Sequence, residues 1–284
     1  MLHAMEHALL HTVEESVTLI LFLFLTYLLM EYLEHRSGDR VKEIVRKSGR
    51  LGPLVGGILG VVPQCGFSAA ASNLYAGRVI TLGTLMAIYL STSDEMLPVM
   101  LASPASVGLI LPILITKVVI GTAFGFLIDL WYGRHGRKVE ELHIHEMCEH
   151  EHCKCEKGIV RSAVRHTVQV GVFILLIAFA LNLVMEIIGE DALSGALLNH
   201  PIAGPLAAGA VGLIPNCAAS VIITQLYLEG ILGTGTMLAG LLSCSGMGLV
   251  VLFRVNENRR ENLKIAGLLY LLGVAVGIVV ELIL

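Results

Sequence analysis

Two short stretches place a proline, an amide and a cysteine in the middle of apolar segments. Residues 60–68 read GVVPQCGFS, and residues 212–220 read GLIPNCAAS. Cysteine thiolates bind soft or borderline metal ions, so Cys65 and Cys217 are candidate ligands; the alternative is that they pack as small hydrophobic side chains. The neighbouring groups that could add oxygen ligands, or instead hydrogen-bond between helices, are Gln64, Ser68, Asn216 and Ser220. Both stretches therefore predict polar breaks in apolar helices, and breaks at membrane depth are tolerated only where they are buried or line a polar cavity.

A second pair of stretches carries hydroxyls and acids. Residues 91–95 read STSDE, and the related residues 243–247 read SCSGM. An ionisable group in a membrane segment is costly and marks a candidate site; the alternative is that the acids reach an interface. The candidate substrate-binding residues here are Ser91, Ser93, Asp94, Glu95, Ser243, Cys244 and Ser245. Because the acids occur in one stretch only, they would give a single acidic pole to an otherwise symmetric site.

Lys117 lies near the centre of the apolar segment 105–130. A buried ammonium requires a counter-charge, and Asp94 or Glu95 is the obvious one. We expect these three residues to couple metal binding to proton release; a purely structural ion pair is the alternative. Two further acids, Asp129 and Glu281, lie at the ends of apolar segments, where we expect them to face water.

The polar stretch 143–156 reads HIHEMCEHEHCKCE. Mixed imidazole and thiolate ligands suit Zn²⁺, Cu or Cd²⁺, although the spacing is not that of a zinc finger. The candidate metal ligands are His143, His145, Cys148, His150, His152, Cys153 and Cys155. This composition favours a loop that collects or senses metal, and a polar linker is the alternative.

The elements that position these residues are helices in a membrane. The chain has 284 residues, 55% of them hydrophobic and 15% charged, against about a quarter charged in soluble domains. Segments 16–33 and 168–185 are long enough to cross a ~30 Å hydrocarbon core. We therefore predict an all-α, polytopic membrane protein. The sequence has no basic stripe, hydrolase or kinase signature, or phosphate-binding loop, so we expect no nucleic-acid partner, no enzymatic activity and no cofactor besides a transported ion.

The chain also contains an internal repeat. A shift of 152 positions places Pro63 and Cys65 on Pro215 and Cys217. Segment 34–50 is rich in Lys and Arg, whereas its counterpart 186–202 has none. Since basic residues accumulate in cytoplasmic loops, the two copies are expected to be inverted, as in many secondary transporters.

The parity of membrane crossings then predicts the internal plan of each copy. Segment 52–77 should form a broken or re-entrant hairpin of two half-helices, and 202–229 should do the same, which gives about five segments per half. The expected organisation is a first membrane repeat (1–131), a cytoplasmic His/Cys-rich connector (132–166) and a second, inverted repeat (167–284). The basic loop near 254–262 would then be cytoplasmic and the N-terminus external; no signal peptide is recognisable.

The stretches GVVPQCGFS, STSDE and GLIPNCAAS, with the His/Cys-rich connector, resemble the ten-transmembrane heavy-metal exporter family. Its members are labelled arsenic efflux proteins or manganese transporters. The resemblance covers nearly the whole chain and implies export of a metal or metalloid ion from the cell. The chain is also more distantly similar to organoarsenical permeases, but it does not contain the Cys-Ser-Cys-Gly pattern of that group.

Three functions remain open. The first is a secondary exporter of divalent metal, driven by proton exchange, with thiols favouring Zn²⁺ or Cd²⁺ and oxygen ligands favouring Mn²⁺. The second is an arsenite or organoarsenical permease in which the thiols are the main ligands and the acids are structural. The third, of another class, is a membrane thiol redox protein. The expected partners are the metal or metalloid ion and membrane lipid, with a homodimer as one option.

Overall fold

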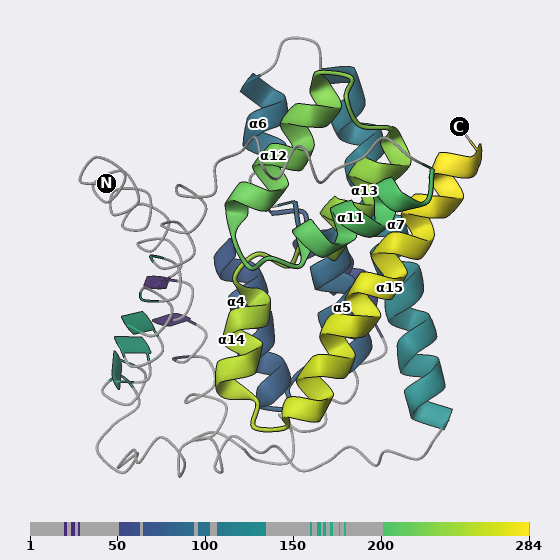
Figure 1. Cartoon of the computed structure of the whole chain (residues 1–284). Helices are drawn as coiled ribbons and strands as arrows, with labels where there is room; N and C mark the ends of the chain where they lie inside the picture. The colour runs from purple at the N-terminus through teal and green to yellow at the C-terminus, as the bar shows by residue number, and fades with distance from the viewer. Residues whose placement is uncertain are drawn as a thin grey trace.

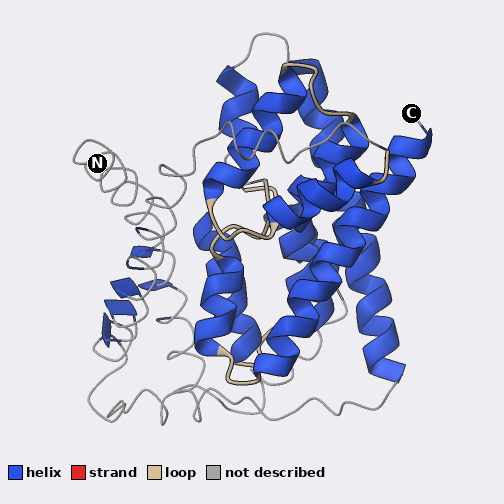
Figure 2. Ribbon diagram, in the orientation of Figure 1, coloured by secondary structure: helices blue, strands red, loops and turns tan. Residues whose placement is uncertain are grey.

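The structure is a computed structural model that describes residues 51–62, 65–93, 96–102, 107–134 and 201–283, together with isolated positions within 20–28 and 160–179. Every regular element in these ranges is a helix, and none of the described residues forms a strand (Figures 1 and 2). The predicted all-α class is confirmed.

The described helices fall into two groups with the same order. The first group is α3 (Gly52–Leu59), α4 (Cys65–Ala76), α5 (Leu82–Ser91), α6 (Met96–Ala102) and α7 (Val107–Arg134). The second group is α11 (Ala203–Gly212), α12 (Cys217–Leu228), α13 (Thr234–Ser243), α14 (Gly248–Val255) and α15 (Arg259–Ile283). Helices α4 and α5 correspond to α12 and α13 at the offset of 152 residues that relates the two sequence copies.

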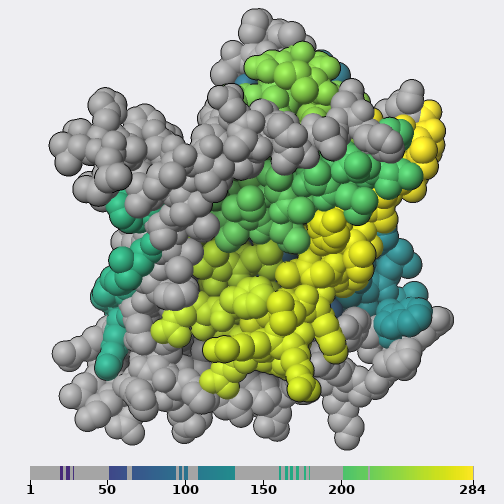
Figure 3. All heavy atoms as spheres, viewed as in Figure 1, coloured from purple at the N-terminus to yellow at the C-terminus, as the bar shows by residue number. Residues whose placement is uncertain are grey.

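Three apolar stretches among the described residues are long enough to cross a membrane: Gly108–Trp131, Thr234–Val255 and Arg259–Ile283. The first and the third carry large exposed apolar side chains, such as Leu111 and Leu271, whereas the second is largely buried inside the molecule. Helices α11 and α15 form much of the face seen in Figure 3. Because a soluble protein rarely exposes such continuous apolar surface, the fold is that of a polytopic membrane protein.

The two groups of helices interlock. Helix α5 packs between α3 and α7, and α13 packs between α11 and α15. At the ends of the molecule the contacts cross between the groups, since α4 packs against α14 and α12 packs against α6 (Figure 1). Helices α5 and α13 also touch each other, so both groups contribute to the middle of the molecule.

Glycine allows α3 to lie directly against α5. A Cβ on Gly52 would lie 2.2 Å from Thr84 Oγ1, and one on Gly60 would lie 2.1 Å from Ser91 Oγ. Contacts that advance together along both helices show that α3 and α5 run in the same direction.

Carboxylates from the long helices cap α5 and α13. Asp129 Oδ1 accepts a hydrogen bond from Gly83 N (2.8 Å), and Asp129 Oδ2 accepts one from Thr81 Oγ1 (2.7 Å). Glu281 Oε2 accepts one from Thr236 N (2.8 Å). The expectation that these two acids face water is wrong: both are partly buried, because a carboxylate satisfies the unpaired N–H groups at a helix N-terminus.

Candidate functional site

Four interruptions separate the short helices. They lie between α3 and α4, between α5 and α6, between α11 and α12, and between α13 and α14. The first and third fall where the proline–amide–cysteine stretches predicted breaks. The other two, which begin at Thr92 and Cys244, were not predicted from the sequence.

Local chemistry explains where these helices begin and end. Asn216 precedes α12, and its side-chain oxygen accepts a hydrogen bond from Ala218 N (2.9 Å) as an N-cap. Thr92 ends α5 with ψ of 126°, and Gly246 follows α13 with φ of +52°, which suits glycine. Hydroxyl and small residues at corresponding positions of the two copies were the sequence signal for this second pair of breaks.

Hydrogen bonds join the interruptions to one another. Ser93 Oγ donates to the carbonyl oxygen of Val61 at 2.5 Å, which connects the two breaks of the first group. Lys117 Nζ donates to the carbonyl oxygen of Thr92 and to that of Leu241, the latter at 3.0 Å. The second contact crosses to the other group, so main-chain oxygens from both groups meet at one ammonium.

The predicted site residues fall into two sets. The described ones are all buried, at 4% exposure or less: Ser68, Ser91, Ser93, Asn216, Ser220, Ser243, Cys244 and Ser245. Gln64, Asp94 and Glu95 lie outside the described residues, as do the side chains of Cys65 and Cys217, whose backbones begin α4 and α12. The ligands predicted in the connector also lie outside them: His143, His145, Cys148, His150, His152, Cys153 and Cys155.

Two of the predicted serines point into contacts between helices. Ser91 Oγ donates to Ala87 O in its own helix (2.7 Å) and lies over Gly60 of α3. Ser243 Oγ lies next to Gly209 and Gly273 and has no hydrogen-bond partner among the described residues. Both hydroxyls thus lie where α5 and α13 pack against their neighbours.

A buried hydroxyl network was missed by the sequence analysis. Ser72 Oγ lies 2.6 Å from the hydroxyl of Tyr89 and 2.8 Å from the carbonyl oxygen of Gly248. It joins α4 and α5 to the first residue of α14. The internal repeat could have indicated this network, because Ser72 corresponds to Thr224, another hydroxyl residue. Thr224 donates to Ser220 O at 2.6 Å.

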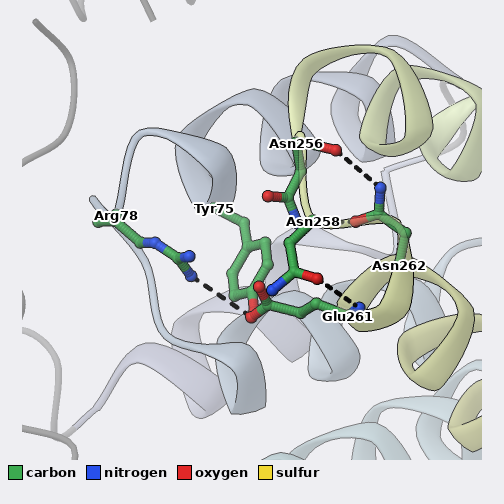
Figure 4. A network of polar contacts seen from close by, with 6 residues as sticks. All are labelled: Tyr75, Arg78, Asn256, Asn258, Glu261 and Asn262. Carbon is green, nitrogen blue, oxygen red and sulfur yellow. Dashed lines mark hydrogen bonds and ion pairs between the residues drawn. The ribbon is translucent and has the colours of Figure 1, made fainter. Parts of the chain in front are cut away.

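A second polar cluster joins the end of α4 and the turn that follows it to the start of α15 and the loop that precedes it (Figure 4). Glu261 Oε1 accepts a hydrogen bond from the hydroxyl of Tyr75 (2.5 Å) and lies 3.4 Å from the guanidinium of Arg78. Asn256 and Asn262 exchange hydrogen bonds beside it (2.6 and 2.8 Å). We call these residues the Arg78–Glu261 cluster. It connects the two groups of helices away from the interruptions.

Within the described ranges, no three His, Cys, Asp or Glu side chains come together in a group that could hold a metal ion.

Interrupted helices, apolar outer faces and buried polar groups shared by two similar halves define a multi-span helical membrane protein. Residues 6–163 and 135–257 match the model of the family described as "Putative, 10TM heavy-metal exporter". The chain belongs to this family, and the resemblance seen in the sequence is confirmed. Neither the curated proteins nor the solved structures include a match to the chain.

Proposed function

We propose that this protein is a secondary active transporter that exports divalent metal ions, such as Mn²⁺, Zn²⁺ or Cd²⁺, across the cell membrane in exchange for protons. The observation that carries the proposal is the meeting of both halves at Lys117, beside two helix interruptions. Irregular backbone at membrane depth is the usual place for a transported ion to bind.

The proposed architecture is an inverted repeat with a re-entrant hairpin in each half. Because α3 runs in the same direction as α5, Gly52 lies beside Thr84 near the start of α5. The end of α4 at Ala76 is only five residues before Thr81, the N-cap of α5. Segment 52–76 thus returns to the end of the molecule from which it starts, which supports re-entrance.

The proposed orientation rests on charge. Arg78 pairs with Glu261 in the first turn of α15, and the adjoining ends of α14 and α15 carry Arg254, Arg259 and Arg260. Basic residues favour the cytoplasmic side. This end would be cytoplasmic, together with the connector 132–166, and the N-terminus would be external. The His/Cys-rich part of the connector would collect or sense metal before export.

The proposed site combines soft and hard ligands. Cys65 and Cys217 each begin a helix, where peptide dipoles favour an anionic ligand. Asp94 and Glu95 follow Thr92, whose carbonyl oxygen accepts from Lys117. In this arrangement an arriving dication competes with the ammonium for the carboxylates, and that competition couples metal binding to proton movement.

A transport assay tests the proposal. Purified protein in liposomes with an imposed pH gradient is offered Mn²⁺, Zn²⁺, Cd²⁺, Co²⁺, Ni²⁺ and arsenite in turn. We expect gradient-dependent transport of at least one divalent ion, and loss of at least tenfold in rate for Asp94→Asn. The matched control is Glu229→Gln, because Glu229 is an exposed acid in the turn after α12.

The same assay separates the other candidates. Transport of arsenite that survives Asp94→Asn and is lost in the Cys65→Ser, Cys217→Ser double variant would instead establish an arsenical permease. Absence of all transport, with a reversible Cys65–Cys217 disulfide found by mass spectrometry, would favour the thiol redox protein.

A further inference from the structure

The ammonium of Lys117 sits between the carboxyl ends of two helices. Thr92 is the C-cap of α5, and Leu241 belongs to the last turn of α13. Both carbonyl oxygens accept a hydrogen bond from Lys117 Nζ, and the side chain is 1% exposed. The lysine reaches this point from the middle of α7, a third helix.

Two helix ends favour a positive charge at this point. The carboxyl end of a helix carries roughly −0.5 elementary charge, so two such ends present about −1. An ammonium at this point is therefore favoured by both helix ends. Main-chain oxygens at the ends of interrupted helices are also the groups that bind Na⁺ or K⁺ in membrane proteins. The ammonium therefore occupies the kind of position that a small inorganic cation would take.

The corresponding position of the second half carries no charge. Lys117 corresponds to Leu269 at the offset of 152 residues, and Leu269 is equally buried, at 0% exposure. The second half thus packs the same position of its long helix without a charge. The lysine occurs in one half only, and there it bonds main-chain oxygens from both halves.

We propose that Lys117 is a tethered cation: it fills a monovalent-cation site formed by the carbonyl oxygens of Thr92 and Leu241, and it makes the protein independent of Na⁺ and K⁺. When the ammonium is removed, the same oxygens bind a free monovalent ion. The claim about cation binding concerns the purified protein alone; only its consequence for export rests on the proposed function.

Thermal unfolding of purified protein tests this in NaCl, KCl and choline chloride at equal ionic strength. Wild type and Lys117→Arg should unfold at the same temperature in all three salts. Lys117→Ala and Lys117→Gln should be stabilised by Na⁺ or K⁺ in a saturable manner, with a rise of about 3 °C for each tenfold increase above half-saturation. Met237→Ala, which also opens space in a buried position of α13, should show no preference among the salts.

Equal unfolding temperatures in the three salts for Lys117→Ala and Lys117→Gln would overturn the proposal. So would failure to obtain either neutral variant folded in Na⁺, K⁺ and Li⁺ alike, because no inorganic ion would then replace the ammonium. Direct binding of ²²Na⁺ to the neutral variants, but not to wild type, is the second readout. These results are independent of metal export: a wild-type protein that moves no metal would refute the proposed function and leave the cation measurement standing.

Discussion

The turn after α4 contains an arginine in a conformation that favours glycine. Arg78 has φ of +59°, and the corresponding residue after α12 is Gly230, with φ of +74°. The backbone bonds of the two turns agree, since Val79 N donates to Leu74 O (2.8 Å) and Ile231 N donates to Leu226 O (2.9 Å). A residue with a Cβ in the left-handed region costs roughly 1–2 kcal/mol relative to the right-handed one.

The side chain of Arg78 offsets that cost. Its guanidinium pairs with Glu261 and lies 5.6 Å from the ring centre of Tyr75. The two paired side chains are 24% and 10% exposed, and their N–O distance is 3.4 Å. At that distance we take the ion pair as about 1 kcal/mol, and the ring contact adds about 0.5 kcal/mol. Strain and attraction are therefore of similar size.

This balance predicts the order of stability of two variants. Arg78→Gly removes both the backbone strain and the side-chain attraction, so it should change the free energy of unfolding by less than about 0.5 kcal/mol. Arg78→Ala keeps the strain and loses the attraction, so it should be about 1 kcal/mol less stable than Arg78→Gly. Gly230→Ala is the matched control: a Cβ there meets no atom within 4 Å, so it should lose about 1 kcal/mol from strain alone.

The measurement is reversible unfolding in mixed detergent and dodecyl sulfate micelles, followed by helical circular dichroism. Equal stability of Arg78→Gly and Arg78→Ala would show that left-handed strain is absent at this turn. A loss above about 2 kcal/mol in Arg78→Gly would show that the attraction greatly exceeds the strain, contrary to the balance worked out above.

Two further variants test the capping carboxylates and the Arg78–Glu261 cluster. Asp129→Ala should destabilise more than Glu281→Ala, by about 1 kcal/mol in the same unfolding assay, because Asp129 accepts two hydrogen bonds at the start of α5 and Glu281 accepts one at the start of α13; a reversed order would contradict this account of the caps. Tyr75→Phe should lose about 1.5 kcal/mol, since it removes a hydrogen bond to a charged oxygen, and this loss should disappear in a Glu261→Gln background if the charge is its source.

The sequence by itself determined the class, the repeat and the position of two breaks. Long apolar segments require helices in a membrane, because lipid offers no partner for backbone polar groups. Pro215 prevents α11 from continuing, and the side chain of Asn216 caps the start of α12. Both effects depend on the local residue types, so they can be predicted from the sequence. The family followed from the same stretches.

Only the tertiary structure decided which polar groups meet. Nothing in the sequence around Lys117 indicates that it bonds the main chain of α13, 124 residues away, because that contact depends on how the two halves pack. The packing role of Ser91 and the capping role of Asp129 could not be predicted for the same reason. From sequence alone, a hydroxyl or carboxylate in an apolar segment is interpreted as a ligand or a surface group, because its neighbours are unknown. The sequence supplies the polar groups and the breaks, and the packing of α5 and α13 against their neighbouring helices determines what each group touches.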